Sequence, residues 1–309
     1  MTKVGIHVSC RLTAPRDACY SRVAKSSGST HRRYRALEYI QVFWICMSRC
    51  CVRSLFLLTG LLLLSVSCLV AQENYEIQVY GSETMPPRKT MVELHSNYTI
   101  EGSTTPQNGV IPTEHALHET LEITQGFTSW FETGFYVFTS ITGSNGWEWV
   151  GDHIRPRVRA PESWHWPVGV SLSAEFGYQR RTYSTTTWDF ELRPIVDKQQ
   201  GRLYWAFNPA FDKGFTGPPH DAAWTFAPAA KVSWDFTKHV TAGVEYYGSF
   251  GPVSNIDPFH DQAQAFYPVI DLNVSPIWEI NFGPGIGVTS GADHLLFKAI
   301  IGRRFSWSH

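Results

Sequence analysis

Residues 168–178 read VGVSLSAEFGY, and larger apolar side chains alternate strictly with small or polar ones along this stretch. One set is Val, Val, Leu, Ala, Phe and Tyr, and the other is Gly, Ser, Ser, Glu and Gly. Successive side chains on a β-strand point to opposite faces. The stretch therefore predicts a strand with one apolar face and one polar face.

The same alternation recurs along the rest of the chain. It predicts twelve strands, at 91–101, 116–125, 130–141, 148–159, 167–180, 186–197, 201–208, 222–235, 239–250, 263–274, 277–288 and 293–305. Most are close in length to the ~9–11 residues that cross a bilayer at a tilt, and bacterial single-chain barrels have an even number of strands. We expect an all-β fold, a closed antiparallel transmembrane β-barrel of about twelve strands over residues 91–309.

The connections between these strands test the prediction independently. If the first strand runs outward, the outer connections are 102–115, 142–147, 181–185, 209–221, 251–262 and 289–292. The inner ones are 126–129, 160–166, 198–200, 236–238 and 275–276. The three longest connections all fall outside, as transmembrane barrels require. A soluble all-β sandwich is the alternative, and it has no reason to sort its loops in this way.

Aromatic residues gather at the predicted strand ends. Rings with one wet edge favour the headgroup level of a membrane, where they form girdles at both interfaces. The girdle candidates are Trp130, Trp147, Trp149, Trp164, Trp166, Trp205, Trp278, Phe305 and Trp307.

The beginning of the chain has the pattern of an export signal. Residues 54–70 read SLFLLTGLLLLSVSCLV, with Arg49 and Arg53 before them and Ala71 after them. A positive region, an apolar run and a small residue predict a Sec signal peptide over 47–71, cleaved after Ala71. A membrane anchor and a lipidated Cys68 are the alternatives.

Two further segments flank this signal. Residues 1–46 are interpreted as an over-extended or disordered leader, because they show no apolar period. Residues 72–90 are polar and are assigned as a periplasmic N-terminal segment. They could remain a periplasmic tail or fold into the barrel lumen, and the sequence does not choose between the two.

Charge and cysteine content exclude several classes of function. Residues 1–71 hold 10 of the 26 Lys and Arg residues but only 2 of the 27 Asp and Glu residues. The rest of the chain is therefore acidic, and we expect no nucleic-acid partner. All six cysteines precede residue 72, which excludes a disulfide scaffold or a cysteine nucleophile in the main body.

Three stretches carry a resemblance to a known family. They are HETLEITQGFTSWFETGFYV at 118–137, DFTKHVTAGVEYYGSFGP at 235–252 and INFGPGIGVTSGADHLLFKAIIGRRF at 280–305. Each resembles the outer-membrane barrels of the MetA-pathway of phenol degradation family. The resemblance spans about residues 91–305 and implies a transporter for small molecules, apolar ones included, without catalytic residues. Barrels commonly end on an aromatic residue, whereas here Ser308 and His309 follow Trp307.

The polar face of each predicted strand should line the lumen. The candidates are Glu93, His95, Asn97, Glu122, Glu132, Arg155, Arg157, Arg159, Glu175, Asp189, Glu191, Arg193, Lys231, Asp235, Glu245, Asp271, Glu279 and Lys298. Because carboxylates outnumber basic groups, such a lumen would favour cations.

Three arginines share one face of the fourth predicted strand. Arg155, Arg157 and Arg159 could form one wall of a constriction or an anion site, or they could pair with carboxylates on neighbouring strands. Asp152 falls on the lipid face of the same strand, so the register there is open.

Enzyme motifs are missing from the sequence. Residues 72–309 contain no HExxH, no GxSxG and no His-x-Ser pair. His115 and His118 are three residues apart, which places them on opposite faces of a strand and makes them poor joint metal ligands. The glycines at 283, 285 and 287 lack the helix of a nucleotide loop. We expect no catalytic residue, no cofactor and no metal site.

These observations together predict an outer-membrane channel or transporter for the passive uptake of small molecules. Its partners would be outer-membrane lipid, the barrel-assembly machinery and a small solute. A barrel enzyme acting on lipid or envelope substrates, and a non-conducting barrel that binds a partner through its outer loops, are the alternatives.

Overall fold

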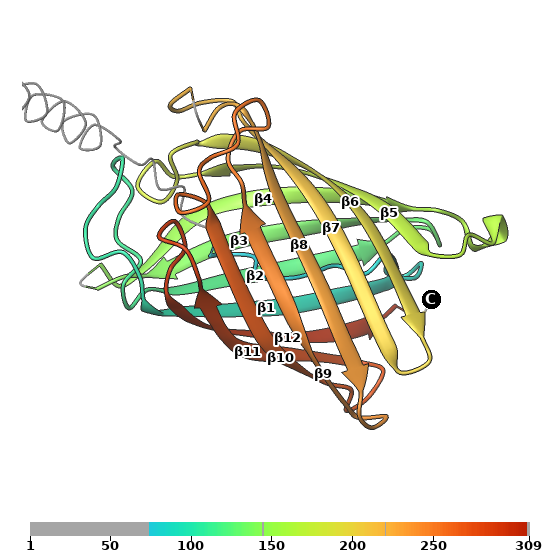
Figure 1. Cartoon of the computed structure of the whole chain (residues 1–309). Coiled ribbons are helices and arrows are strands. Elements are labelled where there is room, and N and C mark those ends of the chain that lie inside the picture. Colours follow the sequence, from blue (N-terminus) through green and yellow to red (C-terminus); the bar gives the residue numbers. More distant parts are fainter. Residues whose placement is uncertain (1–73, 144, 220, 308–309) are drawn as a thin grey trace, which may run out of the picture. The chain divides into compact units, whose positions relative to one another are not determined.

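Twelve strands form one closed antiparallel barrel in the computed structural model (Figure 1), which describes residues 74–143, 145–219 and 221–307. The predicted leader and signal peptide lie outside the described residues, as do Ser308 and His309. The strands are β1 (Lys89–Glu101), β2 (Leu117–Gly126), β3 (Phe131–Ile141), β4 (Trp147–Arg159), β5 (Gly169–Gln179), β6 (Trp188–Gln200), β7 (Leu203–Gly214), β8 (Trp224–Asp235), β9 (Val240–Ser249), β10 (Ala263–Leu272), β11 (Trp278–Gly287) and β12 (Leu295–Ser306). No helix in this part of the chain is long and apolar enough to cross a membrane.

Each strand pairs with the next along the chain, and β1 pairs with β12 to close the barrel. The predicted fold class is therefore confirmed. Connections 102–116 and 250–262 lie at one end, called the loop end here, and the short connections 127–130 and 201–202 lie at the other, the turn end. The turn end has one longer connection, 160–168, which contains the 3-10 helix Glu162–Trp164.

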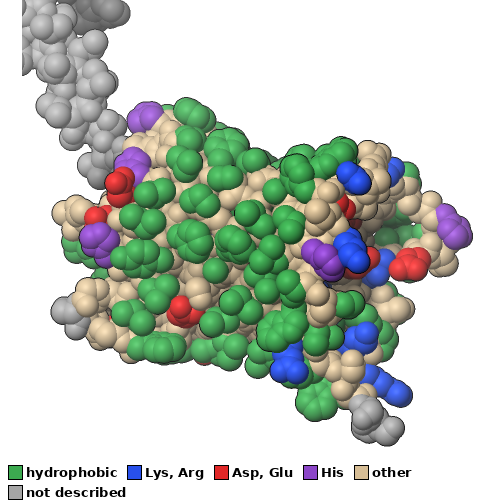
Figure 2. Space-filling view, turned by 90° about the horizontal axis from the view of Figure 1, so that it is seen from below, with side chains coloured by type: hydrophobic (Ala, Val, Ile, Leu, Met, Phe, Trp, Pro, Cys, Tyr) green, Lys and Arg blue, Asp and Glu red, His purple; other side chains and the backbone are tan. Residues whose placement is uncertain are grey.

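The alternation in the sequence becomes two chemically different surfaces. On β2, Leu121 and Ile123 point outward and are about two-fifths exposed, whereas Thr120 and Glu122 point inward and are almost fully buried. Figure 2 shows one side of the barrel wall covered by apolar side chains, with most charged residues toward its two ends. An apolar exterior around a polar interior is the arrangement of transmembrane barrels.

Aromatic side chains lie at both ends of the wall. Of the predicted girdle residues, Trp147 and Trp149 are at the loop end and the others are at the turn end; all are exposed except Trp205, which is half-buried. The loop end also has Trp188 and Trp224, which begin β6 and β8 and which the sequence analysis did not single out.

A β-bulge settles the open register of β4. The pairing of β3 with β4 shifts by one residue between Phe138 and Thr139: Phe138 pairs with Gly151, and Thr139 pairs with Trp149. Beyond this bulge Arg155 and Arg157 point inward, while Asp152 points outward and accepts a hydrogen bond from the Trp149 indole at 3.2 Å.

The predicted end of the seventh strand was wrong. We expected the strand to end at residue 208 and a loop to follow over 209–221. In the structure β7 continues through Pro209 to Gly214, and Pro209 pairs with Pro228 of β8. The ladder between β6 and β7 is interrupted beside Pro194 and Pro209 and resumes at Leu192 and Phe211. Both prolines lie on the outward parity, where a closed barrel tolerates a local gap.

A charge on the outer wall should destabilise the barrel. Val244 lies in the middle of β9 and is about half exposed. Val244→Arg should cost about 2–4 kcal/mol, because an arginine there meets acyl chains at mid-depth. Denaturant unfolding in lipid vesicles measures this. Val253→Arg is the control, since Val253 is equally exposed but lies in the 250–262 connection. Equal costs for both variants would mean that the wall does not face lipid.

Candidate functional site

Residues 74–88, called the plug segment here, lie inside the barrel. At the loop end, the Asn74 amide donates to Asp293 at 2.7 Å. At the turn end, the Arg88 N–H donates to the Gly126 carbonyl at 3.2 Å. The segment therefore runs the length of the lumen before β1 begins (Figure 1). The sequence left two placements open for 72–90, and residues 74–88 lie in the lumen in this structure.

Side chains of the wall hold the backbone of the plug segment. The Asn208 amide of β7 donates to the Tyr80 carbonyl at 2.9 Å and accepts from the Tyr80 N–H at 2.7 Å. An amide side chain thus replaces a neighbouring strand at this position. Arg157 of β4 donates to the carbonyls of Gly81 and Glu83, at 3.0 and 2.7 Å.

Similar contacts hold the half of the plug segment nearer the loop end. The Thr120 hydroxyl donates to the Tyr75 carbonyl at 2.7 Å, and the Lys298 ammonium donates to the Ile77 carbonyl at 2.9 Å. Asn97 of β1 donates to the Asn74 carbonyl at 2.9 Å. Buried backbone groups require partners, and in this segment the wall supplies many of them.

Two apolar clusters anchor the plug segment against opposite parts of the wall. Ile77 is fully buried in a cluster whose wall members are Ala229, Tyr247, Ala265, Tyr267, Val269 and Leu296. Tyr75 is buried in a second cluster, with Tyr136, Phe138, Val150 and Tyr183. A glycine makes room in the first, since a Cβ on Gly285 would overlap the Tyr267 ring. Close packing against Tyr267 thus explains the glycine at position 285.

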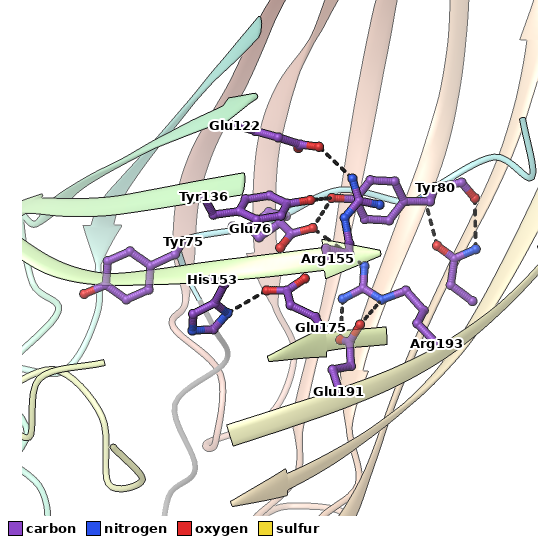
Figure 3. A network of polar contacts seen from close by, with 12 residues as sticks. Tyr75, Glu76, Tyr80, Glu122, Tyr136, His153, Arg155, Glu175, Glu191 and Arg193 are labelled. Carbon is purple, nitrogen blue, oxygen red and sulfur yellow. Dashed lines mark hydrogen bonds and ion pairs between the residues drawn. The ribbon is translucent and has the colours of Figure 1, made fainter. Parts of the chain in front are cut away.

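An aromatic ring of the plug segment lies among arginines of the wall (Figure 3). The guanidinium of Arg155 is 4.3 Å from the centre of the Tyr80 ring, and that of Arg193 is 5.2 Å away. Cations over an aromatic face are attracted by its quadrupole. The Tyr80 hydroxyl donates to Glu76 and lies 3.2 Å from the Tyr136 hydroxyl.

The predicted lumenal arginines are paired with carboxylates. Arg155 reaches Glu122 at 2.6 Å, and Arg157 reaches Glu132 at 2.6 Å. Gly134 lies opposite Arg155 on β3, and a Cβ there would be 3.3 Å from the guanidinium, so glycine leaves space for Arg155 to cross to β2.

Pairing of this kind is the second alternative that the sequence left open. Arg157 pairs with Glu132 on the neighbouring strand β3, whereas Arg155 reaches past β3 to Glu122 on β2. Arg159 instead contacts Glu162 of the 160–168 connection, at 3.1 Å.

The remaining predicted lumenal residues also lie on inward parities. Glu245 contacts Lys298 and lies 3.1 Å from Lys231, which in turn reaches Asp271 at 2.8 Å. On the other side of the lumen, Glu191 pairs with Arg193, Glu175 lies 2.6 Å from His153, and Asp189 lies 3.6 Å from the same histidine. At the turn end, Asp235 accepts from Thr241 and Glu279 pairs with Arg304. Glu93, His95 and Glu122 form a separate cluster on β1 and β2.

Sequence reasoning missed the plug segment itself, although a signal was present. Tyr75, Ile77 and Val79 alternate with Glu76 and Gln78, which is the same period as in the strands. Its overall polarity and the Pro86-Pro87 pair concealed this pattern. Asn208 was also missed, because its pairing with the Tyr80 backbone depends on a contact between segments far apart in the sequence.

A cavity of about 350 Å³ opens at the loop end beside the plug segment. Tyr75, Tyr183 and Tyr247 contribute aromatic lining. The carboxylates that line it are Glu76, Asp189, Glu191, Asp212, Asp221 and Asp293, and the basic residues are Arg193 and two histidines. In the 180–187 connection, burial and a hydrogen bond to Glu148 raise the pKa of Tyr183 to about 12, so its hydroxyl stays neutral. The cavity is acidic and partly aromatic.

Comparison with known proteins gives similar folds only. No family model matches the chain, and no curated protein matches it. An outer membrane channel from Pseudomonas putida F1 is 11% identical, with 74% of this chain and all of that chain covered and a TM-score of 0.48. The NanC porin is 10% identical over 70% of this chain and all of its own, with a TM-score of 0.47. The KdgM porin in complex with disordered oligogalacturonate is 12% identical over 71% and 99%, with a TM-score of 0.42.

Loss of the two hydrogen bonds between Asn208 and the Tyr80 backbone should make the plug segment more mobile without destabilising the barrel wall. Asn208→Ala leaves two backbone groups of Tyr80 without these partners, and each buried unpaired group costs about 1–3 kcal/mol. We expect faster hydrogen exchange over 74–88 and unchanged exchange in β1–β12. Asn281→Ala is the matched control, because Asn281 is also buried and inward but bonds Asp271 of the wall. Equal loosening of 74–88 in both variants would contradict the role of Asn208.

Proposed function

We propose that this chain is an outer-membrane channel for the passive passage of small molecules, in which the plug segment obstructs the lumen. The observation that carries this proposal is the way the plug segment is held. Asn208, Arg157 and Lys298 bind its backbone with side chains, while the closed ladder β1–β12 does not include it. The segment can therefore be displaced without breaking any backbone pair of the wall.

The two surfaces of the wall support the outer-membrane location. A closed sheet pairs its backbone groups within the protein, which the hydrocarbon core of a membrane requires. Exposed apolar residues such as Leu121, Phe135 and Val244 would face acyl chains. In the ordinary topology of such barrels, the loop end faces outward and the turn end faces the periplasm.

The cavity at the loop end supports a preference among solutes. Its carboxylates would attract cations and repel anions as a solute enters. Its tyrosines give flat surfaces against which an aromatic ring can pack. We propose that the solutes are small cationic or neutral molecules, aromatic ones included, which agrees with the family resemblance in the sequence.

Removal of the plug segment should open the channel. Deletion of residues 75–85 leaves all twelve strands intact, and the single-channel conductance in planar bilayers should rise several-fold above that of the intact barrel. Heat-modifiable migration in gels would confirm that the variant has folded. A folded variant with no conductance would reject the channel and favour an enzyme or a scaffold barrel.

A reversible lock provides the control for this deletion. Residues 72–309 contain no cysteine, so Tyr80→Cys with Asn208→Cys introduces the only two thiols of the mature chain. A short bis-methanethiosulfonate crosslinker, which attaches to each cysteine through a disulfide and releases sulfinate, should lower the conductance, and a reducing agent that cleaves these disulfides should restore it. Each single cysteine variant should show no effect of the crosslinker.

The open channel should prefer cations. In the plug-deleted protein, the reversal potential in a potassium chloride gradient should show K⁺ passing more readily than Cl⁻, because carboxylates dominate the cavity. Asp189→Asn with Asp212→Asn should reduce this preference. Glu162→Gln is the control, since Glu162 is exposed in the connection at the other end. Anion preference in the plug-deleted protein would contradict the role of the acidic cavity.

A further inference from the structure

Two carboxylates face each other across adjacent strands of the wall. Glu93 of β1 pairs directly with Glu122 of β2 in the antiparallel register, and both side chains point into the lumen. Like charges directly opposite each other destabilise a sheet, and here both groups are also buried. A positive charge is therefore needed between the two carboxylates.

The nearby arginine serves only one of the two carboxylates. Glu122 Oε1 accepts from Arg155 at 2.6 Å and from the Thr124 hydroxyl at 2.6 Å. Glu122 Oε2 makes no hydrogen bond. Glu93 has no ion pair among the residues that the structure describes, and its buried Oε1 has no hydrogen-bond partner.

A histidine completes the cluster. His95 follows Glu93 by two residues on β1, so its ring lies on the same face. The ring is fully buried, its Nδ1 has no hydrogen-bond partner, and its Nε2 lies 3.3 Å from Glu122 Oε2 without forming a hydrogen bond. One ligand atom from each of Glu93, His95 and Glu122 lies within 4.8 Å of the other two. Apart from the 3.3 Å approach of His95 Nε2 to Glu122 Oε2, the buried polar atoms of this cluster have no hydrogen-bond partner at Glu93 Oε1 or at His95 Nδ1.

We propose that Glu93, His95 and Glu122 bind one divalent transition-metal ion, with Zn²⁺ as the best match. One imidazole nitrogen and two carboxylates are a donor set that Zn²⁺ favours. Two ligands of a tetrahedral ion at about 2.0–2.1 Å are about 3.3 Å apart, and His95 Nε2 lies 3.3 Å from Glu122 Oε2. Glu93 closes the third side after a small side-chain rotation.

The surroundings of this site have the features of a metal centre. Arg155 and Thr124 orient Glu122 through its other oxygen, as outer partners orient metal ligands. Arg155 also stacks on Tyr80, so the site lies beside the plug segment. Three protein ligands leave a fourth position free for water or a solute group.

Zinc binding to the intact mature barrel tests this proposal. Protein without an affinity tag is purified in detergent and stripped with a chelator, and Zn²⁺ is then added in a calorimeter. We expect one site per barrel that disappears in Glu93→Gln with His95→Gln. His95→Gln alone should weaken binding by about tenfold or more, since changes outside the ligand shell already cost 10–100-fold. His118→Gln is the matched control, because His118 is also buried and inward but bonds Ser140.

Thermal unfolding separates the metal from a shared proton. In chelator, Glu93→Gln should melt at or above the wild-type temperature, because it removes the repulsion. With Zn²⁺, only the wild type and His118→Gln should gain stability. Wild-type protein that binds no more Zn²⁺ than the double variant would overturn the proposal, as would equal losses in His95→Gln and His118→Gln. Co²⁺ added to wild-type protein should give visible bands of a tetrahedral site, and their absence would also overturn it.

Discussion

A charged side chain that leaves water must meet an opposite charge or a set of hydrogen bonds, because desolvation costs several kcal/mol per ion. The interior of this barrel holds many such groups, and most are in short contacts. Arg155 reaches Glu122, Arg157 reaches Glu132, and Lys231 lies between Glu245 and Asp271. These pairs determine which side chains remain available to the plug segment.

The plug segment is bound by donor groups that the ion pairs of the wall do not use. Arg157 uses Nε for Glu132 and its two terminal nitrogens for carbonyls of the plug segment. Lys298 is shared in the same way between Glu245 and the Ile77 carbonyl. The fixed fork of a guanidinium suits this double task. The same cation thus satisfies a carboxylate of the wall and a backbone group of the plug segment, which couples the position of the plug segment to the charge pattern of the lumen.

The sequence could predict the wall because period-two alternation is a local property. It located all twelve strands and placed Glu93, Arg155 and Lys298 on inward faces before any register was known. It could not predict which charges meet. That depends on strand pairing and on the bulge near Gly151, and Arg155 passes its immediate neighbour to reach a strand further on. The end of the seventh strand was also misjudged, because β7 continues through Pro209, which pairs with Pro228 of β8.

Among the described residues of β1 and β2, the cluster of Glu93, His95 and Glu122 is the place where a buried charge lacks an opposite charge. Glu175 and Glu191 also face each other, across β5 and β6, but each has a partner, His153 and Arg193 respectively. Glu93 faces Glu122 and has no ion pair among the residues that the structure describes. A proton on Glu93 would remove one negative charge, but it would not explain why one ligand atom from each of three buried residues lies within 4.8 Å of the other two. A metal ion would neutralise both carboxylates and would bind His95 Nε2, which lies 3.3 Å from Glu122 Oε2. The convergence of the three ligand atoms is therefore what favours a metal over a proton.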